Sequence, residues 1–188
     1  RAVESYRSQK LVNTIGYLSA LSNLGAVLLE MNDVTGARDV FVEVLEGCRR
    51  LTPQEPLTLT AMNNLASAER RLGRLEEARV MWEELVGLQR EQLGEDHVAT
   101  LATMNNLATV YSMLGREADS LALHEQVVAV RRRVLPVGHP SLVRSLQNYG
   151  TQLVRLGRIE EGAAAIEEAL ETSKTTLKPD DQQTLTML

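Results

Sequence analysis

The sequence predicts an all-α protein of the solenoid class, in which antiparallel helix pairs follow one another along the chain. A short motif, Asn-Leu-Ala or a close variant, recurs at intervals of 42 residues and begins at Asn64, Asn106 and Asn148. A Gly-Arg pair follows each copy at the same interval. A fixed period of this length is the sequence signature of proteins that stack one structural repeat on the next.

The first half of each period has the pattern of an amphipathic helix. Apolar residues recur three or four positions apart, as at Leu59, Met62 and Leu65, and this spacing places them on one helical face. The glycine that follows can adopt the positive φ that ends many helices. The predicted A helices cover residues 57–72, 99–114 and 141–156.

A second amphipathic stretch follows each glycine. The predicted B helices cover residues 75–92, 117–134 and 159–176. Acidic residues gather at their starts and a basic residue recurs near their ends, which complements the helix macrodipole. All five prolines fall between a B helix and the next A helix, where the missing N–H does not break a helix.

A fourth copy of the motif lies upstream and is one residue shorter. It begins at Asn23, and Asn32 stands where the other copies have glycine. Asparagine tolerates the left-handed backbone conformation better than most residues, so the turn is expected to survive. The chain is therefore predicted to form a single array of four repeats, over residues 15–52, 57–94, 99–136 and 141–178.

Two longer motifs repeat with the same period. They are Met-Asn-Asn-Leu-Ala (62–66 and 104–108) and Leu-Gly-Arg (72–74, 114–116 and 156–158). A further motif, Leu-Gly-Glu-Asp-His (93–97), lies between two repeats. On these motifs the chain resembles the tetratricopeptide repeat (TPR), in the 42-residue form found in kinesin light chains, over essentially its whole length. The resemblance implies a right-handed superhelix whose A helices form a concave wall that holds ligands. Glu69 stands where that family usually places an aromatic residue.

Both ends of the sequence continue the pattern. Residues 1–12 are expected to be the end of a preceding B helix, and residues 182–188 the start of a further A helix. We therefore expect the sequence to be part of a longer array. Because a terminal repeat without a polar cap leaves its packing surface open, weak end-to-end self-association is also expected.

Composition excludes several classes of protein. Hydrophobic residues make up 44% of the chain and charged residues 24%, which is typical of a folded globular protein. No apolar run is long enough to cross a bilayer, and the net charge of −5 argues against a nucleic-acid partner. The single cysteine, Cys48, favours a reducing compartment. We expect a soluble, cytoplasmic protein without membrane insertion.

No group of residues has the pattern of a catalytic or metal site. His97 and His139 occupy equivalent loops and are interpreted as structural. His124 lies on the packing face of a B helix, in the register of Trp82, and is interpreted as a core histidine. The run 131–133 of three arginines ends a helix, where cations are favoured. We therefore expect no enzymatic activity, no cofactor and no metal.

One face of the A helices is a candidate binding surface, because polar residues follow it from repeat to repeat. At about 100° per residue, this face lies opposite the apolar packing face. The predicted peptide-binding residues are Asn23, Asn63, Asn64, Ser67, Arg70, Arg71, Asn105, Asn106, Thr109, Met113, Arg144, Gln147, Asn148, Thr151 and Arg155. Four of them are termed the asparagine ladder: Asn23, Asn64, Asn106 and Asn148.

An asparagine side chain offers two hydrogen-bond donors and one acceptor, and these suit the backbone of an extended peptide. The alternative is structural, because the same side chains could bridge adjacent helices. Arginines on this face would select acidic ligands, and Met113 would contact an apolar anchor.

The sequence favours a non-enzymatic protein–protein interaction scaffold that binds an extended, acidic peptide segment in the groove lined by the A helices. The alternative is a regulatory or self-associating repeat arm of a larger signalling protein, such as a nucleotide-binding sensor. The flanking sequence would discriminate between the two, because a nucleotide-binding module beside the array would favour the second.

Overall fold

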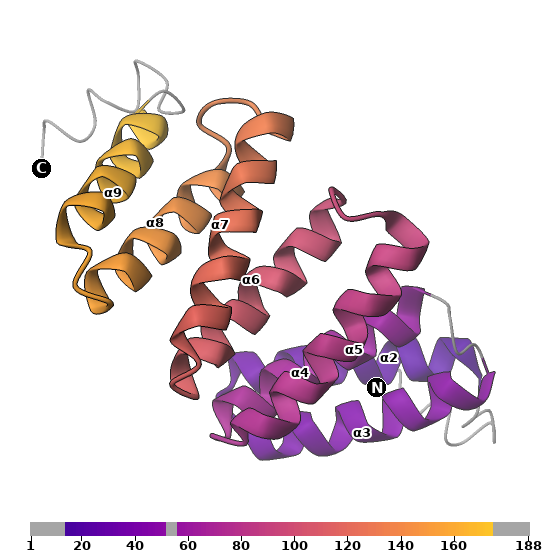
Figure 1. Ribbon diagram of the computed structural model, residues 1–188. Coiled ribbons are helices and arrows are strands. Elements are labelled where there is room, and N and C mark those ends of the chain that lie inside the picture. The colour runs from indigo at the N-terminus through magenta and orange to yellow at the C-terminus, as the bar shows by residue number, and fades with distance from the viewer. Residues whose placement is uncertain (1–13, 52–55, 175–188) are drawn as a thin grey trace, which may run out of the picture. The chain divides into compact units, whose positions relative to one another are not determined.

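The structure is a computed structural model, and it describes residues 14–51 and 56–174 (Figure 1). These residues form eight α-helices and no β-strand. The helices are α2 (Ile15–Glu30), α3 (Val34–Leu51), α4 (Pro56–Arg71), α5 (Leu75–Leu93), α6 (Val98–Met113), α7 (Glu117–Val134), α8 (Pro140–Arg155) and α9 (Ile159–Lys174). The helices expected within residues 1–12 and 182–188 lie outside the described residues. None of the described helices is both long enough and apolar enough to span a bilayer.

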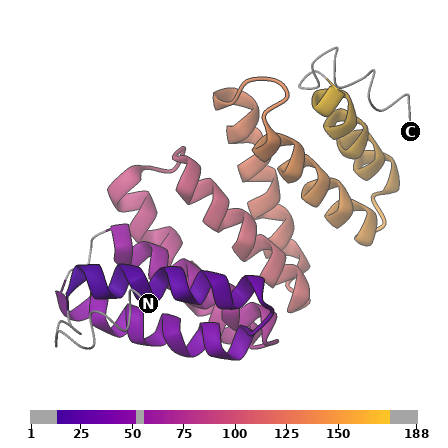
Figure 2. The ribbon, with the colours of Figure 1, turned by 180° about the vertical axis from the view of Figure 1, so that it is seen from behind.

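The chain divides into two compact units, Arg1–Leu88 and Gln89–Leu188, and the boundary falls within α5. In the first unit, α3 packs against both α2 and α4, and α2 also contacts α4. In the second unit, α7 packs against both α6 and α8, and α8 packs against α9 (Figure 2). Both α3 and α7 are B helices, and each contacts its own A helix and the next one. Each unit thus has the nearest-neighbour packing of a helical repeat.

The turns between A and B helices share one backbone geometry. The turn residue has a positive φ in every repeat: 62° at Asn32, 78° at Gly73, 74° at Gly115 and 78° at Gly157. In the second repeat, the N–H of Arg74 donates to the carbonyl of Glu69 at 2.9 Å, which is the long bond of a Schellman motif. The prediction that Asn32 takes the place of glycine is confirmed.

The A helices of the third and fourth repeats begin at a histidine cap. Nδ1 of His97 accepts a hydrogen bond from the N–H of Ala99 at 3.2 Å, and Nδ1 of His139 accepts one from the N–H of Ser141 at 3.1 Å. Each bond satisfies an N–H group that has no partner within its helix. The two histidines therefore serve the fold, as their equivalent positions in the sequence indicated.

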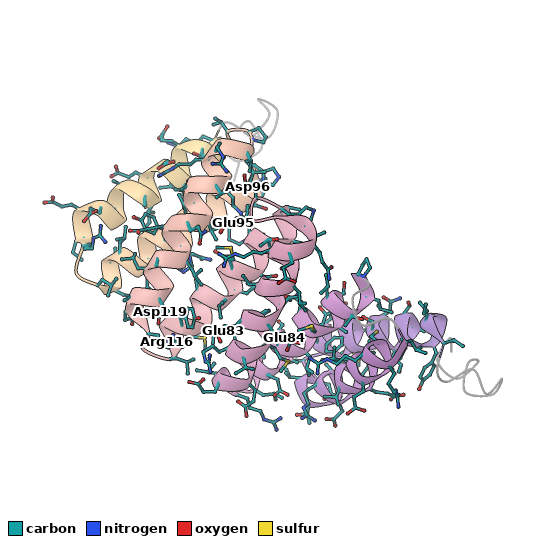
Figure 3. All side chains as sticks on the ribbon, turned by 45° about the vertical axis from the view of Figure 1, so that its right-hand side comes forward. Glu83, Glu84, Glu95, Asp96, Arg116 and Asp119 are labelled. Atoms are coloured by element: carbon teal, nitrogen blue, oxygen red, sulfur yellow. The ribbon has the colours of Figure 1, made fainter. Side chains whose placement is uncertain are left out.

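The B helices begin with acidic side chains, as the sequence predicted. The residues in the first turns of α5, α7 and α9 are Glu76, Glu77, Glu117, Asp119, Glu160 and Glu161. At the start of α7, Nε of Arg116 donates to Asp119 at 2.8 Å, and the two side chains lie beside each other (Figure 3). These carboxylates lie at the positive end of the helix macrodipole and stabilise it.

In the fourth repeat, α8 and α9 approach closely at two glycines. A Cβ atom at Gly150 would lie 2.8 Å from the carbonyl oxygen of Gly162 and 2.7 Å from the side chain of Ile166. Gly150 and Gly162 together allow the two backbones to approach this closely. A side chain at either position would force the helices apart.

Glu69, the residue at the expected aromatic position, is buried between two arginines. It is 4% exposed. Nε of Arg38 on α3 donates to Oε1 at 3.0 Å, and Nη1 of Arg74 donates to Oε2 at 3.2 Å. A buried carboxylate requires such partners, because an uncompensated buried charge is strongly destabilising. Ion pairs thus link α4 to the preceding B helix where an aromatic contact was expected.

The centre of the second repeat is filled by Trp82 on α5. The side chain is 1% exposed, and its Nε1 donates to Oδ1 of Asn63 on α4 at 3.0 Å. The indole therefore combines a large buried apolar area with a satisfied polar atom. Phe41 occupies the equivalent position in the first repeat and is fully buried.

We expect Trp82→Ala to lower the free energy of unfolding by about 3–5 kcal/mol, since it removes a large buried aromatic side chain. Trp82→Phe is the control, because it keeps most of the apolar volume and loses only the hydrogen bond to Asn63, about 1 kcal/mol. Urea unfolding of the three proteins measures both values. A loss below about 1 kcal/mol for Trp82→Ala would show that the indole is not buried.

Candidate functional site

A pocket of about 170 Å³ lies in the second unit, between the C-terminal halves of α6 and α8, with α7 behind them. Its lining residues are Thr109, Ser112, Met113, His124, Asn148, Thr151, Gln152 and Arg155. The fold brings together here a group of the residues predicted to bind peptide, namely Thr109, Met113, Asn148, Thr151 and Arg155. The pocket is therefore the candidate site.

His124 lines the pocket at a register position where the second repeat has a larger side chain. His124 occupies the register of Trp82, and Asn105 occupies that of Asn63. In the second repeat, the indole reaches the asparagine and bonds to it. In the third repeat, Oδ1 of Asn105 instead accepts a hydrogen bond from Nδ2 of Asn148 at 3.2 Å. The pocket lies beside this imidazole and the A helices α6 and α8.

His124 is buried and neutral. The side chain is 3% exposed, and its Nδ1 has no hydrogen-bond partner among the described residues. Burial lowers the pKa of the imidazole from 6.5 to about 4, because the charged form would lose its hydration. The imidazole at neutral pH therefore presents one donor and one acceptor to its surroundings.

A hydrogen-bonded network forms one wall of the pocket. Arg155 donates to the hydroxyl of Ser112 and, through Nη2, to Oε1 of Glu117 at 3.1 Å. The hydroxyl of Ser112 donates to Oε1 of Gln152 at 2.8 Å, and Nε2 of Gln152 donates to Glu117. The network joins the third repeat to the fourth. Because Glu117 pairs with Arg155, the wall carries little net charge.

The structure shows the structural role of the asparagine ladder at this site, and its peptide-binding role stays a prediction. Asn148 bridges α8 to α6 through Asn105, which is 8% exposed, so one of its N–H groups serves the packing of adjacent repeats. Oδ1 and the second N–H of Asn148 have no partner among the described residues. Asn106 is half-buried on α6, and Oγ1 of Thr109 donates to the carbonyl of Asn105 at 3.0 Å.

The first unit holds the remaining residues of the predicted face. Asn23 is exposed, and Asn64, Ser67 and Arg70 are half-buried. Arg71 donates to the carbonyl of Leu29 at 3.2 Å and to Oδ1 of Asn32 at 3.0 Å.

These contacts give Arg71 and Asn63 a structural role. Arg71 ties α4 to the end of α2, and Asn63 is held by Trp82. Both partners of Arg71 are uncharged, so its positive charge is not neutralised by them.

Arg144 and Gln147 lie on α8 and are exposed. Arg144 forms no ion pair with a described residue, in contrast to Arg155. The positive charge on this face of the second unit is therefore carried mainly by Arg144.

Sequence reasoning did not assign Ser112, His124 and Gln152 to the site. A signal for Gln152 was present, because it takes the register of Ala68 and Val110, which are fully buried and apolar. A polar residue in a core register has to bond to something. His124 is likewise a polar residue at a core position, and the sequence analysis interpreted it only as a core histidine.

Other reactive or charged side chains make structural contacts or are buried. The run of arginines 131–133 binds protein acceptors, which are Ser141 and Ser145 for Arg131, Glu168 for Arg132 and Asp96 for Arg133. The thiol of Cys48 is buried, and burial raises its pKa. The described residues contain no cluster of His, Cys, Asp and Glu side chains suited to a metal ion.

The buried imidazole predicts a specific pH dependence of stability. The unfolded chain binds the proton near pH 6.5, whereas folded His124 binds it only near pH 4. Acidification through this interval therefore favours the unfolded state, and the stability present above pH 6.5 is lost as the pH approaches 4. We expect wild type to lose roughly 2–3 kcal/mol more than His124→Gln over this interval.

Urea unfolding at both ends of the interval measures this difference, and other titrating groups cancel because both proteins share them. The same pH dependence in the two proteins would contradict the burial of a neutral imidazole.

The fold matches solved structures of helical repeats. The TPR-like repeats of a Podosopora anserina protein assigned as a kinesin light chain superpose with a TM-score of 0.79 at 24% identity, over 94% of this chain and 84% of that chain. BtubC (BKLC) from P. vanneervenii gives a TM-score of 0.79 at 18% identity, over 87% and 66% of the two chains. MamA gives 0.65 at 16% identity, over 92% and 87%. At these identities the likeness establishes the fold.

Family assignment comes from the sequence model of the tetratricopeptide repeat, which matches residues 16–84 and 57–133. No curated protein sequence matches the chain significantly. The prediction of an all-α helical-repeat solenoid is confirmed. Because the matched segments cover more than half of its length, the chain belongs to the tetratricopeptide repeat family.

Proposed function

We propose that the A-helix face of the second unit binds an extended peptide segment of a protein partner and catalyses no reaction. TPR arrays of this type are protein-interaction scaffolds, and this fold is typically not enzymatic. The observation that carries the proposal is the pocket, which gathers five of the predicted peptide-binding residues in one place.

Hydrogen-bonding capacity supports a peptide backbone as the ligand. Asn148 keeps an acceptor and a donor beyond its bond to Asn105, and the exposed Gln147 and Thr151 lie on the same helix. An extended peptide has N–H and C=O groups that are unpaired and need such partners. Side chains with both donors and acceptors suit this backbone better than charged groups do.

Charge supports an acidic segment. Arg144 is exposed and without an ion pair among the described residues, whereas the charge of Arg155 is offset by Glu117. In the first unit, Arg71 keeps its charge because it bonds to neutral oxygens. We therefore assign the acidic preference of the second unit to Arg144, with Arg155 acting mainly as part of the pocket wall.

The proposal places the protein in the cytoplasm, which the single buried and free thiol supports. The alternative, a regulatory or self-associating arm of a larger signalling protein, stays a prediction, as does weak end-to-end self-association.

We expect Arg144→Glu to remove the preference for acidic peptides, because it replaces the unpaired cation of this face with an anion. Arg50→Glu is the matched control, since Arg50 is exposed at the end of α3 in the first unit and its substitution makes the same change of charge without changing a residue of this face. Arrays of acidic and neutral peptides, probed with each protein at low and high salt, measure the preference. High salt should mimic Arg144→Glu in the wild type by screening. Equal losses in the two variants would contradict the assignment.

We expect Asn148→Ala to weaken peptide binding by about 1–2 kcal/mol, because it removes hydrogen bonds to the backbone. It should also lower stability, since Asn105 loses its partner. Melting curves beside the array measurement separate the two effects. Unchanged binding by the folded variant would leave Asn148 with a structural role only.

A further inference from the structure

We propose that the pocket beside His124 is a subsite for one uncharged side-chain carboxamide, that of an asparagine or glutamine in the bound segment. This inference rests on the proposed function and adds the chemistry of one recognised side chain. Three observations support it: a histidine in the pocket lining whose Nδ1 has no partner among the described residues, the remaining hydrogen-bonding groups, and the charge balance.

The pocket is large enough for a side chain. Its volume of about 170 Å³ far exceeds the roughly 10–15 Å³ needed by one water molecule on a comparable measure. Met113 on one side is 48% exposed and provides a flexible apolar contact for the methylene groups of an entering side chain.

His124 brings an imidazole with unused hydrogen-bonding capacity to the pocket lining. His124 lines the pocket, and its buried Nδ1 has no partner in the described part of the chain. Leaving such an atom unsatisfied is costly, and native structures rarely do so. At neutral pH the imidazole has one donor and one acceptor, so it matches a group that itself carries both.

The other polar groups of the lining have the same mixed character. Asn148 retains a donor and an acceptor after bonding to Asn105, and Thr151 is exposed and brings a hydroxyl group. Asparagine and threonine side chains can each donate and accept. A carboxamide can therefore satisfy several of these groups at once, whereas a carboxylate only accepts and an ammonium only donates.

The charge of the site favours a neutral ligand. Arg155 is paired with Glu117 at 3.1 Å. A carboxylate in the pocket would therefore be attracted little by Arg155, whose charge is already neutralised, and would be repelled by Glu117. A lysine would approach Arg155. A neutral group avoids both costs. The pocket and Arg144 thus recognise different parts of the peptide. The pocket binds the carboxamide, and Arg144 attracts acidic residues elsewhere in the segment.

The test uses His124→Trp, which the protein itself suggests. Trp82 fills the equivalent position in the second repeat and bonds to Asn63, so an indole at position 124 should fill the pocket and bond to Asn105 while the fold is kept. Thr151→Val is the second variant. It changes an exposed hydroxyl and keeps the subsite testable if His124→Trp fails to fold.

A library of random twelve-residue peptides is selected on the full chain and on each variant. We expect wild type to enrich peptides that share asparagine or glutamine at one position. Replacing that residue with aspartate or glutamate should weaken binding about tenfold, as a lost hydrogen bond and a misplaced charge would. His124→Trp should abolish this preference and keep the acidic preference elsewhere in the peptide, and Thr151→Val should reduce the carboxamide preference.

A second measurement does not require a peptide. Propionamide and sodium propionate are titrated separately into the wild-type protein, and the ring nitrogens of His124 are followed by NMR. Propionamide should shift them at concentrations where propionate does not.

Enriched peptides without a shared carboxamide, or a carboxamide preference that His124→Trp leaves intact, would overturn the subsite while leaving the proposed function in place. Equal responses of His124 to the two small molecules would also overturn it and leave water as the occupant of the pocket. If no peptide is enriched on wild type, the proposed function and the subsite both fail.

Discussion

The packing of one central side chain from each B helix against its A helix is the contact on which the rest of this array depends. In a helical repeat no pair of helices can bury its apolar face alone, and each B helix lies against its own A helix and the next. Phe41 and Trp82 fill this central position in the first two repeats and are almost completely buried. The third repeat places His124 there. This position therefore borders a pocket in the third repeat.

The hydrogen bonds around His124 differ from those around Trp82. An indole reaches the neighbouring asparagine and satisfies it, as Trp82 does for Asn63. In the third repeat Asn105 bonds to Asn148 of the next repeat, Nδ1 of His124 has no described partner, and His124 lines a pocket. The same register position thus has different surroundings in the second and third repeats, while the turns keep one backbone geometry.

Adjacent repeats are also held together by polar links. Glu69 is buried between Arg38 and Arg74, and the second unit buries Arg131, whose pKa is lowered by burial and by the nearby charge of Arg144. Arg131 compensates by donating to oxygens of the next A helix. Such buried charges are weak evidence for stability, because desolvation offsets much of their attraction. Their geometry fixes how one helix is seated on the next.

The sequence by itself determined the fold and the positions of its helices and turns. The period of 42 residues placed the helices to within one or two residues, and the left-handed turn at Asn32 followed from the backbone preference of asparagine. These features are local, so periodicity and residue type suffice to predict them. Helical spacing also placed Asn148, Thr151 and Arg155 on one face. The tertiary structure alone decided which groups on that face are already occupied: Asn63 by Trp82, and Arg155 by Glu117. It also decided that His124 borders a pocket, because a cavity depends on the volumes of side chains from three helices and no single helix encodes that sum.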